Sequence, residues 1–187
     1  MPRTSRKKPD SPNAGKKKNQ SIVRYCVIPS PVGHLLLAGD QKALHCLSFQ
    51  DGKNPEIPSS HWIHDQKPFN DVIQQLGEYF SGTRTTFSIN LSPHGTPFQR
   101  RVWHALTKIP YGQTVSYGSI AKSIGQPTAS RAVGSANGQN PLSIFVPCHR
   151  VIGQSGQLIG YGGGLHIKEK LLALEHQVSS KCAPMTS

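Results

Sequence analysis

One short segment of the sequence places a nucleophile, a base and a cation side by side: Pro147-Cys148-His149-Arg150. It follows residues 143–146, a β-branched and aromatic run that predicts a short buried strand. A cysteine at the end of such a strand is held rigidly, and a neighbouring cation or base lowers the cost of forming the nucleophilic thiolate. The segment therefore predicts a reactive thiol at Cys148. The alternative is a buried structural cysteine, the commoner fate of an isolated Cys.

A carboxylate further along the chain could complete this site. Glu175 projects from the apolar side of the predicted helix 167–175, so we expect it to be buried and to have a partner. If Glu175 meets His149, it fixes the imidazole and stabilises its charged form in a Cys–His–Glu relay. The alternative is a structural ion pair between Glu175 and Arg150.

The glycine-rich segment 160–164 precedes that helix. It lacks the Lys-Ser/Thr pair of a P-loop and follows no suitable strand, so a nucleoside triphosphate site is not expected. A flexible pocket wall fits better, with Tyr161 supplying an aromatic surface.

Cysteine and histidine spacing does not predict a metal site. The four cysteines contain no C-x-x-C pair, which is typical of a reducing compartment where thiols stay free. The His-x-x-His pair at 61–64 lies in a predicted loop, and His45-Cys46 lies in a strand where neighbours face opposite ways.

Charge is distributed unevenly along the 187 residues, whose net charge is +12. Residues 1–20 carry seven Lys/Arg and one acidic residue. Residues 21–95 carry five Lys/Arg and six acidic residues, and residues 96–187 carry nine Lys/Arg and two acidic residues. No Asp or Glu occurs between Glu78 and Glu169. The second half is therefore predicted to face a polyanion, with nucleic acid the first candidate. The alternative is a solvated basic surface.

The first part of the chain predicts a basic tail and a small domain. Residues 1–20 contain almost nothing apolar and are typical of a disordered tail. In the domain at 21–90, three β-type runs (22–29, 34–40 and 43–49) predict an antiparallel meander. A helix over about 69–80 and a further strand over 85–90 follow.

The second domain, residues 91–178, is predicted to be mostly helical. Its first helix starts at Thr96-Pro97, and helices 116–124 and 128–138 outline a helix-turn-helix. The last of these has an apolar stripe formed by Ala129, Ala132, Val133 and Ala136. Its opposite face, which would let the backbone approach a DNA groove, consists of Arg131, Gly134, Ser135 and Gly138. The alternative is a tightly packed helix pair. Residues 179–187 are predicted to be a flexible C-terminus.

Three strings together carry a family resemblance: Arg131-Ala132-Val133-Gly134, Asn140-Pro141, and residues 147–152 (PCHRVI). They resemble the O6-alkylguanine-DNA alkyltransferases, and within them the bacterial constitutive type. The resemblance is strongest over about 96–175. A weaker similarity over 22–90 implies a ribonuclease-H-like N-terminal domain beside a winged-helix-like C-terminal domain, an α+β fold.

The resemblance implies the chemistry. Cys148 would accept an alkyl group from O6 of guanine, and by extension from O4 of thymine, in a single irreversible turnover without a cofactor. His149 would act through a water as the base, with Glu175 behind it. Asn140 would brace the active-site turn, and Tyr161 would donate to the base.

It also implies how DNA is bound. Arg131 would fill the stack after the damaged base is flipped out, and Tyr117 would push the neighbouring phosphate. The small-residue helix face would lie in the minor groove. In the base pocket, the Val151 carbonyl would accept from the guanine amine, and Gly162 stands where some members have Ser. The partner is thus double-stranded DNA containing O6-alkylguanine.

The sequence predicts neither a structural zinc ion nor a membrane-spanning helix. Asp40 stands where a zinc-binding relative has Cys, although His45 matches another ligand position, so no structural zinc is expected. We expect a monomer with no obligate protein partner. No apolar run reaches the roughly 20 residues of a membrane span, and the location is predicted to be cytoplasmic, or nuclear in a eukaryote. The alternatives are a lesion-binding relative without transfer, a cysteine hydrolase, and a plain helix-turn-helix regulator.

Overall fold

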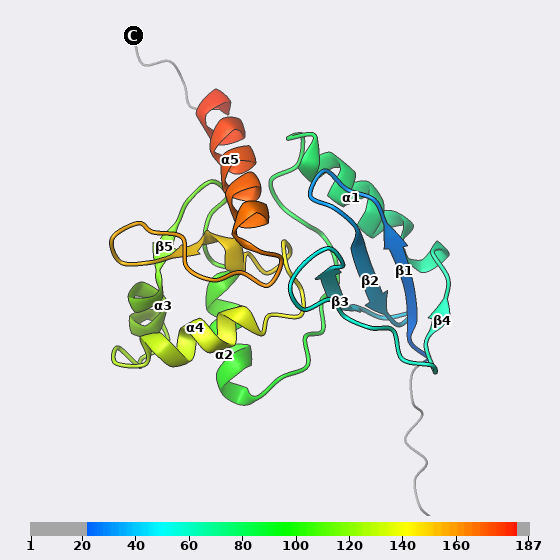
Figure 1. Ribbon diagram of the computed structural model, residues 1–187, viewed down its shortest axis with the longest axis horizontal. Coiled ribbons are helices and arrows are strands. Elements are labelled where there is room, and N and C mark those ends of the chain that lie inside the picture. Colours follow the sequence, from blue (N-terminus) through cyan, green and yellow to red (C-terminus); the bar gives the residue numbers. More distant parts are fainter. Residues whose placement is uncertain (1–21, 183–187) are drawn as a thin grey trace, which may run out of the picture.

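The computed structural model describes residues 22–182. The predicted tail at 1–20 and the last five residues lie outside that range. Within it, the chain forms a sheet domain followed by a mostly helical domain, which lie side by side (Figure 1). No helix of residues 22–182 is both long and apolar enough to cross a membrane.

The first domain is built on a four-stranded sheet of order β3-β2-β1-β4. The predicted meander is confirmed: β1 (Arg24–Ile28), β2 (Leu35–Gly39) and β3 (Leu44–Phe49) pair antiparallel. All five residues of β2 are buried, as expected for an apolar central strand. The short β4 (Ile63–His64) then joins β1 in parallel, which the sequence patterns did not predict.

Helix α1 (Asn70–Phe80) follows a 3-10 turn, η1 (Lys67–Phe69), and matches the predicted helix. It buries Val72, Leu76 and Tyr79 on one side, as its periodicity predicts. The predicted strand at 85–90 is wrong. This segment reaches β3 at a single bridge between Leu44 and Leu91, and the Ser92 carbonyl beyond it contacts His45 Nδ1 at 3.1 Å instead of extending a backbone ladder.

The second domain contains the predicted helix-turn-helix. Helix α2 (Pro97–Leu106) starts at a capping box formed by Thr96 and Gln99. Helices α3 (Tyr117–Ser123) and α4 (Ser130–Gly138) are joined by a turn in which Gly125 has φ of +73°. Strands β5 (Val115–Ser116) and β6 (Val151–Ile152) form a parallel pair beside them.

The faces of α4 differ in part from those predicted. Val133 and Ala136 are buried, but Ala132 is exposed and Asn137 is buried in its place. The helix starts at Ser130, two residues later than predicted, and packs through positions i, i+3 and i+4. Trp103 of α2 fixes this packing by donating from Nε1 to the Ala136 carbonyl at 2.8 Å.

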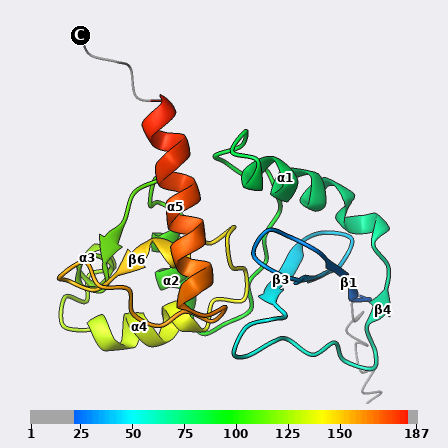
Figure 2. The same cartoon turned by 45° about the horizontal axis from the view of Figure 1, so that its top comes forward.

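The last helix, α5 (Leu165–Cys182), is longer than the predicted 167–175 and continues past the predicted domain end at 178. Figures 1 and 2 both show it along the side of the second domain that faces α1. Its C-terminal part packs on turns of both domains: a Cβ at Gly82 would lie 2.8 Å from Val178, and a Cβ at Gly112 would overlap Ser179. Residues 179–182 are therefore helical rather than part of a flexible end.

Candidate active site

Cys148 lies in a tight turn in the interior, with 3% of its surface exposed. The predicted strand before it, 143–146, is wrong: this segment is a turn in which Ile144 has φ of +72°. Pro147 (φ −79°, ψ 65°) forms an inverse γ-turn closed by the Cys148 N–H donating to the Val146 carbonyl at 2.7 Å. A 3-10 turn, η2 (Cys148–Arg150), follows directly. Tight turns therefore hold the thiol in place, without a strand.

Two asparagine amides hold this turn. Asn140 donates from Nδ2 to the Val146 carbonyl at 2.8 Å and accepts from the Leu142 N–H at 3.0 Å, which matches its predicted bracing position. Asn137, which sequence reasoning did not single out, donates from Nδ2 to the Cys148 carbonyl at 3.3 Å. The nucleophile's backbone is thus fixed on both sides.

Burial raises the pKa of the Cys148 thiol, because a thiolate loses its hydration in the interior. Asn140, Ser143 and the positive charge of Lys168 oppose this rise. Lys168 is fully buried and donates from Nζ to the carbonyls of Val151 at 2.6 Å and Ile159 at 3.2 Å. The helical stripe that identified Glu175 also contains Lys168, seven residues earlier, so the sequence pattern could have identified it too.

The structure brings His149 and Glu175 together, as the relay requires. His149 Nε2 lies 2.7 Å from Glu175 Oε1, and both side chains are fully buried. His149 Nδ1 is buried with no hydrogen-bond partner among residues 22–182. Burial lowers the pKa of His149, and Glu175 acts in the opposite direction. The imidazole is therefore oriented by Glu175, and its second nitrogen is available for another partner.

Glu175 also makes the ion pair that was the alternative reading. Arg150 donates from Nε to Oε2 at 2.8 Å and from Nη2 to Oε1 at 2.9 Å, and the Gly112 N–H donates to Oε2 at 3.1 Å. Burial by itself raises the pKa of Glu175, but the hydrogen bonds from His149 and Arg150 outweigh it and hold the pKa at about 2. Relay and ion pair therefore share one carboxylate.

The first domain contributes to this site. Tyr79 of α1 donates from its hydroxyl to Glu175 Oε1 at 2.8 Å. The sequence signal for this contact was the hydroxyl of Tyr79, a polar group on the otherwise apolar side of the predicted helix 69–80. The sequence does not reveal the hydrogen-bond partner of that hydroxyl.

A pocket of about 510 Å³ lies between α3, α4 and the glycine-rich segment. Most of the predicted DNA-binding and base-pocket residues line it: Tyr117, Arg131, Gly134, Gly138, Tyr161 and Gly162. Asn137 also lines it, as does Asn54 from the first domain. Of the predicted set, Ser135 is exposed, accepts from Gln139 at 3.1 Å and is not among the lining residues.

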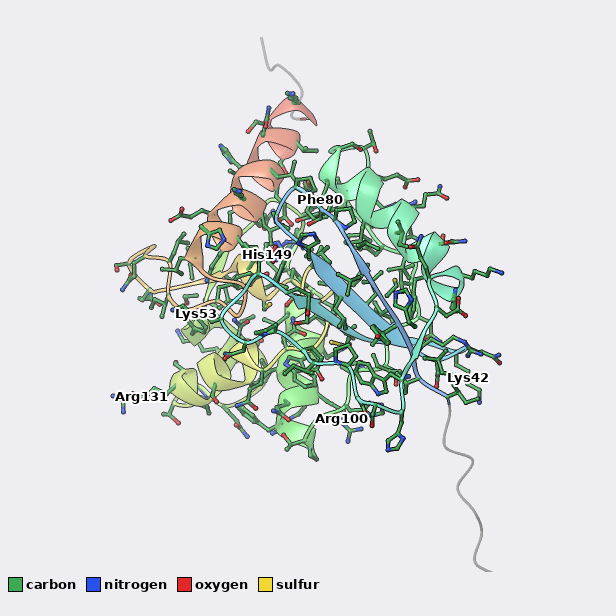
Figure 3. The ribbon with its side chains drawn as sticks, turned by 45° about the vertical axis from the view of Figure 1, so that its right-hand side comes forward. Lys42, Lys53, Phe80, Arg100, Arg131 and His149 are labelled. Carbon is green, nitrogen blue, oxygen red and sulfur yellow. The ribbon has the colours of Figure 1, made fainter. Side chains whose placement is uncertain are left out.

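The side chains around the pocket differ strongly in exposure. Arg131 is exposed at the outer end of α4, whereas His149 lies in the interior (Figure 3). Tyr117 donates from its hydroxyl to the Ile159 carbonyl at 3.2 Å. The Tyr161 hydroxyl is buried with no partner among the described residues, and burial raises its pKa well above the ordinary value. A protonated phenol and a surface guanidinium thus flank one pocket.

Val151 and Gly162, two of the predicted base-pocket residues, differ in how closely other groups surround them. The Val151 carbonyl, expected to accept from a guanine amine, already accepts from Lys168 Nζ. A Cβ built at Gly162 would meet no atom within 4 Å, so glycine is not sterically required there. Its neighbour Gly163 is packed: a Cβ there would lie 2.8 Å from the Phe49 ring.

The two zinc-related positions contact each other directly. His45 Nε2 lies 3.4 Å from Asp40 Oδ2. Backbone N–H groups, that of Lys42 first, lower the pKa of Asp40 to about 2, and His45 adds to this. Over residues 22–182, no cluster of three or more His, Cys, Asp or Glu side chains is placed to hold a metal ion.

Comparison with known proteins identifies both halves of the chain. Residues 97–177 match the family described as 6-O-methylguanine DNA methyltransferase, DNA binding domain, and residues 23–93 match its ribonuclease-like domain. The methylated-DNA–protein-cysteine methyltransferase of Methanosarcina acetivorans is 52% identical over 152 residues, which cover 81% of this chain and 97% of that protein. That of Mycolicibacterium paratuberculosis is 51% identical over 158 residues, with coverages of 84% and 95%.

Comparison with solved structures points to the same family. A crystal structure of Mycobacterium tuberculosis O6-methylguanine methyltransferase has a TM-score of 0.79 at 50% identity and covers 88% of this chain and 96% of its own. The Mycobacterium tuberculosis OGT structure in complex with DNA gives 0.78 at 50% identity, with coverages of 83% and 94%. The family resemblance and the α+β fold are thereby confirmed. The chain belongs to the methylated-DNA–protein-cysteine methyltransferase family.

Proposed function

We propose that this protein repairs O6-alkylguanine in double-stranded DNA by moving the alkyl group onto Cys148. The observation that carries the assignment is the placement of Cys148 in a braced turn next to the His149–Glu175 pair. Membership of the family supports the reaction type. The assignment of each role to a residue of this chain rests on the geometry.

The thiolate of Cys148 attacks the alkyl carbon in line with the bond to O6. A sulfur–carbon bond forms, the carbon–oxygen bond breaks, and its electron pair leaves with guanine. Tyr161 is buried and protonated, so it is suited to donate to the leaving oxygen. His149, neutral and held through Nε2, receives the thiol proton at Nδ1 through a water. A thioether has no ready return path, so each molecule reacts once.

The target atom is out of reach inside a duplex, so the nucleotide must first be flipped. Arg131 is exposed on the α4 face that also contains Gly134 and Gly138, and it is placed to occupy the gap in the stack. The small residues beside it allow the helix to approach the groove. We extend the proposal to O4-alkylthymine, which presents an alkyl group in the same chemical setting.

The test is intact-protein mass after incubation with a duplex containing O6-methylguanine. We expect a gain of one methyl group, mapped to Cys148 and stopping at one equivalent. Cys148→Ala should gain nothing, and Cys46→Ala should behave as wild type. Tight binding of damaged DNA without any mass gain would instead indicate a lesion-binding protein. Repeated turnover on an ester or amide would indicate a hydrolase.

A further inference from the structure

The helical domain has a second cavity, of about 450 Å³, between α2, α3 and the segment that joins them. It shares no lining residue with the pocket beside α4. Apolar side chains form its floor: Ala105, Ile109, Val115, Ile120 and Ile124. The residues Ile109 and Ile120 are buried, and the other three are half-buried. We call this cavity the α2–α3 groove, and its volume is typical of a ligand site.

One rim of the α2–α3 groove is basic. Arg101 and His104 lie one turn apart on α2, Lys108 follows in the turn after that helix, and all three are exposed. None of the ion pairs formed within residues 22–182 includes any of them. No Asp or Glu lines the groove. An unpaired basic rim above an apolar floor is complementary to a ligand that carries both acidic and apolar groups.

The α2–α3 groove lies on the opposite side of α3 from the pocket that contains Arg131. Ser119 and Ser123 line the groove, whereas Tyr117 lines the other pocket. With about 3.6 residues per helical turn, the two serines project from the side of α3 opposite Tyr117. A ligand in the groove therefore leaves the predicted DNA-binding side of this helix uncovered.

The apolar floor distinguishes between nucleic acid and protein as the ligand. A phosphate backbone would pair with Arg101 and Lys108 but offers no apolar group to Ile109 and Ile120. A helix whose apolar side is flanked by Asp or Glu would satisfy the rim and the floor together. We propose that the α2–α3 groove binds an acidic amphipathic helix of a partner protein. A contact of this size fits a transient partner rather than an obligate one.

The experiment measures the binding of three synthetic peptides to the full chain by fluorescence anisotropy. Each peptide is about 16 residues long, enough to form a helix, and all three have the same leucine side. The positions that flank the leucines are Glu in the first peptide, Gln in the second and Lys in the third. We expect the Glu peptide to bind with a Kd of roughly 10–100 µM. The Gln peptide should bind roughly fivefold more weakly, because it lacks the exposed ion pairs.

Reversing the charge of the rim tests where the peptide binds. The double variant Arg101→Glu/Lys108→Glu should bind the Glu peptide at least roughly tenfold more weakly, and it should bind the Lys peptide instead. The control, Arg100→Glu/Lys122→Glu, makes the same change of charge at exposed positions outside the groove. It should bind the Glu peptide within about twofold of wild type, because distant exposed charges are screened. If thermal melting shows that the rim variant does not fold, Arg101→Gln/Lys108→Gln replaces it, and the Glu and Gln peptides should then bind equally.

Three results would overturn the proposal. The first is a Glu peptide that binds wild type no better than the Gln peptide does, or does not bind at all. The second is an equal loss of binding in the rim variant and the control, which would indicate general attraction to a basic surface. The third is a much larger loss of affinity for duplex DNA in the rim variant than in the control, which would assign the groove to DNA. Methyl transfer to Cys148 is measured separately, so a failure of the proposed function would be recognised independently of these results.

Discussion

The hydroxyl of Tyr79 and the carboxylate of Glu175 are joined by a 2.8 Å hydrogen bond, although the residues are 96 positions apart. Both side chains are fully buried. The same Oε1 that accepts from Tyr79 also lies 2.7 Å from His149 Nε2. The sheet domain therefore helps to hold the carboxylate that orients the imidazole of the other domain.

Replacing Tyr79 by Phe should test this link. A buried hydrogen bond to a charged acceptor contributes about 1.5–3 kcal/mol, so Tyr79→Phe should lower the free energy of unfolding by that amount. Urea titration measures it. Tyr25→Phe is the control, because Tyr25 packs through its ring against Trp62 and His64, and it should change stability by less than about 0.5 kcal/mol. Equal effects of the two changes would contradict the assignment.

The depressed pKa of Glu175 predicts an acid-sensitive fold. Its folded pKa is about 2 and its ordinary value is 4.5, so the ionised form stabilises the fold above pH 4.5. That contribution, roughly 3 kcal/mol, is lost as the pH falls from 4.5 to about 2. Stability measured by urea unfolding across this window should fall more steeply for wild type than for Glu175→Gln. Asp40 titrates in the same window in both proteins and cancels in the comparison. Identical slopes would contradict the prediction.

The strands and helices that follow a simple local residue pattern could be predicted from the sequence. Short β-type runs bounded by turn residues predicted the strands β1 to β3, and the 3.6-residue period with its terminal signals predicted α1 and α2. The prediction of a strand at 143–146 was wrong because apolar β-branched residues are typical of any buried segment, whether or not it is a strand. Only the structure shows that Ile144 has φ of +72° and turns the chain.

The residues of the candidate site likewise fall into two groups, those that the sequence could identify and those that it could not. Cys148, His149 and Glu175 could be named because a cysteine–histidine pair and a buried carboxylate are unusual in themselves. Their partners Tyr79 and Asn137 could not, because each acts through a contact that depends on how separate helices pack. No spacing along the chain encodes such a contact.

Lys168 should help to ionise the thiol. Its positive charge opposes the rise in the pKa of Cys148 that burial causes. Lys168→Met should therefore raise that pKa further and move the pH profile of methyl transfer to higher pH. A rise of about one unit lowers the rate near neutral pH roughly tenfold. Lys170→Met, an exposed change on the same helix, should leave the profile where it is. A profile that does not move in Lys168→Met would show that the lysine acts only through its bonds to Val151 and Ile159.

The glycine-rich segment should tolerate substitution unevenly. A methyl group at Gly163 would press on Phe49 and Ile167, so Gly163→Ala should destabilise the fold by about 1–3 kcal/mol. Gly162→Ala meets open space and should be close to neutral. Melting temperatures of the two variants give the comparison. A reversed order would mean that the segment packs differently against β3.

Arg131 should matter only where a duplex has to be opened. Flipping a base out of the stack costs a few kcal/mol, and a side chain that fills the gap offsets part of that cost. Arg131→Ala should therefore slow transfer from duplex O6-methylguanine by at least roughly tenfold, yet change transfer from the same base in a single strand much less. Arg100→Ala removes an equal charge from an exposed position outside the pocket (Figure 3), so it separates the loss of charge from the loss of the inserted side chain. Equal slowing of Arg131→Ala on both substrates would mean that Arg131 contributes general attraction to DNA rather than support for the flipped state.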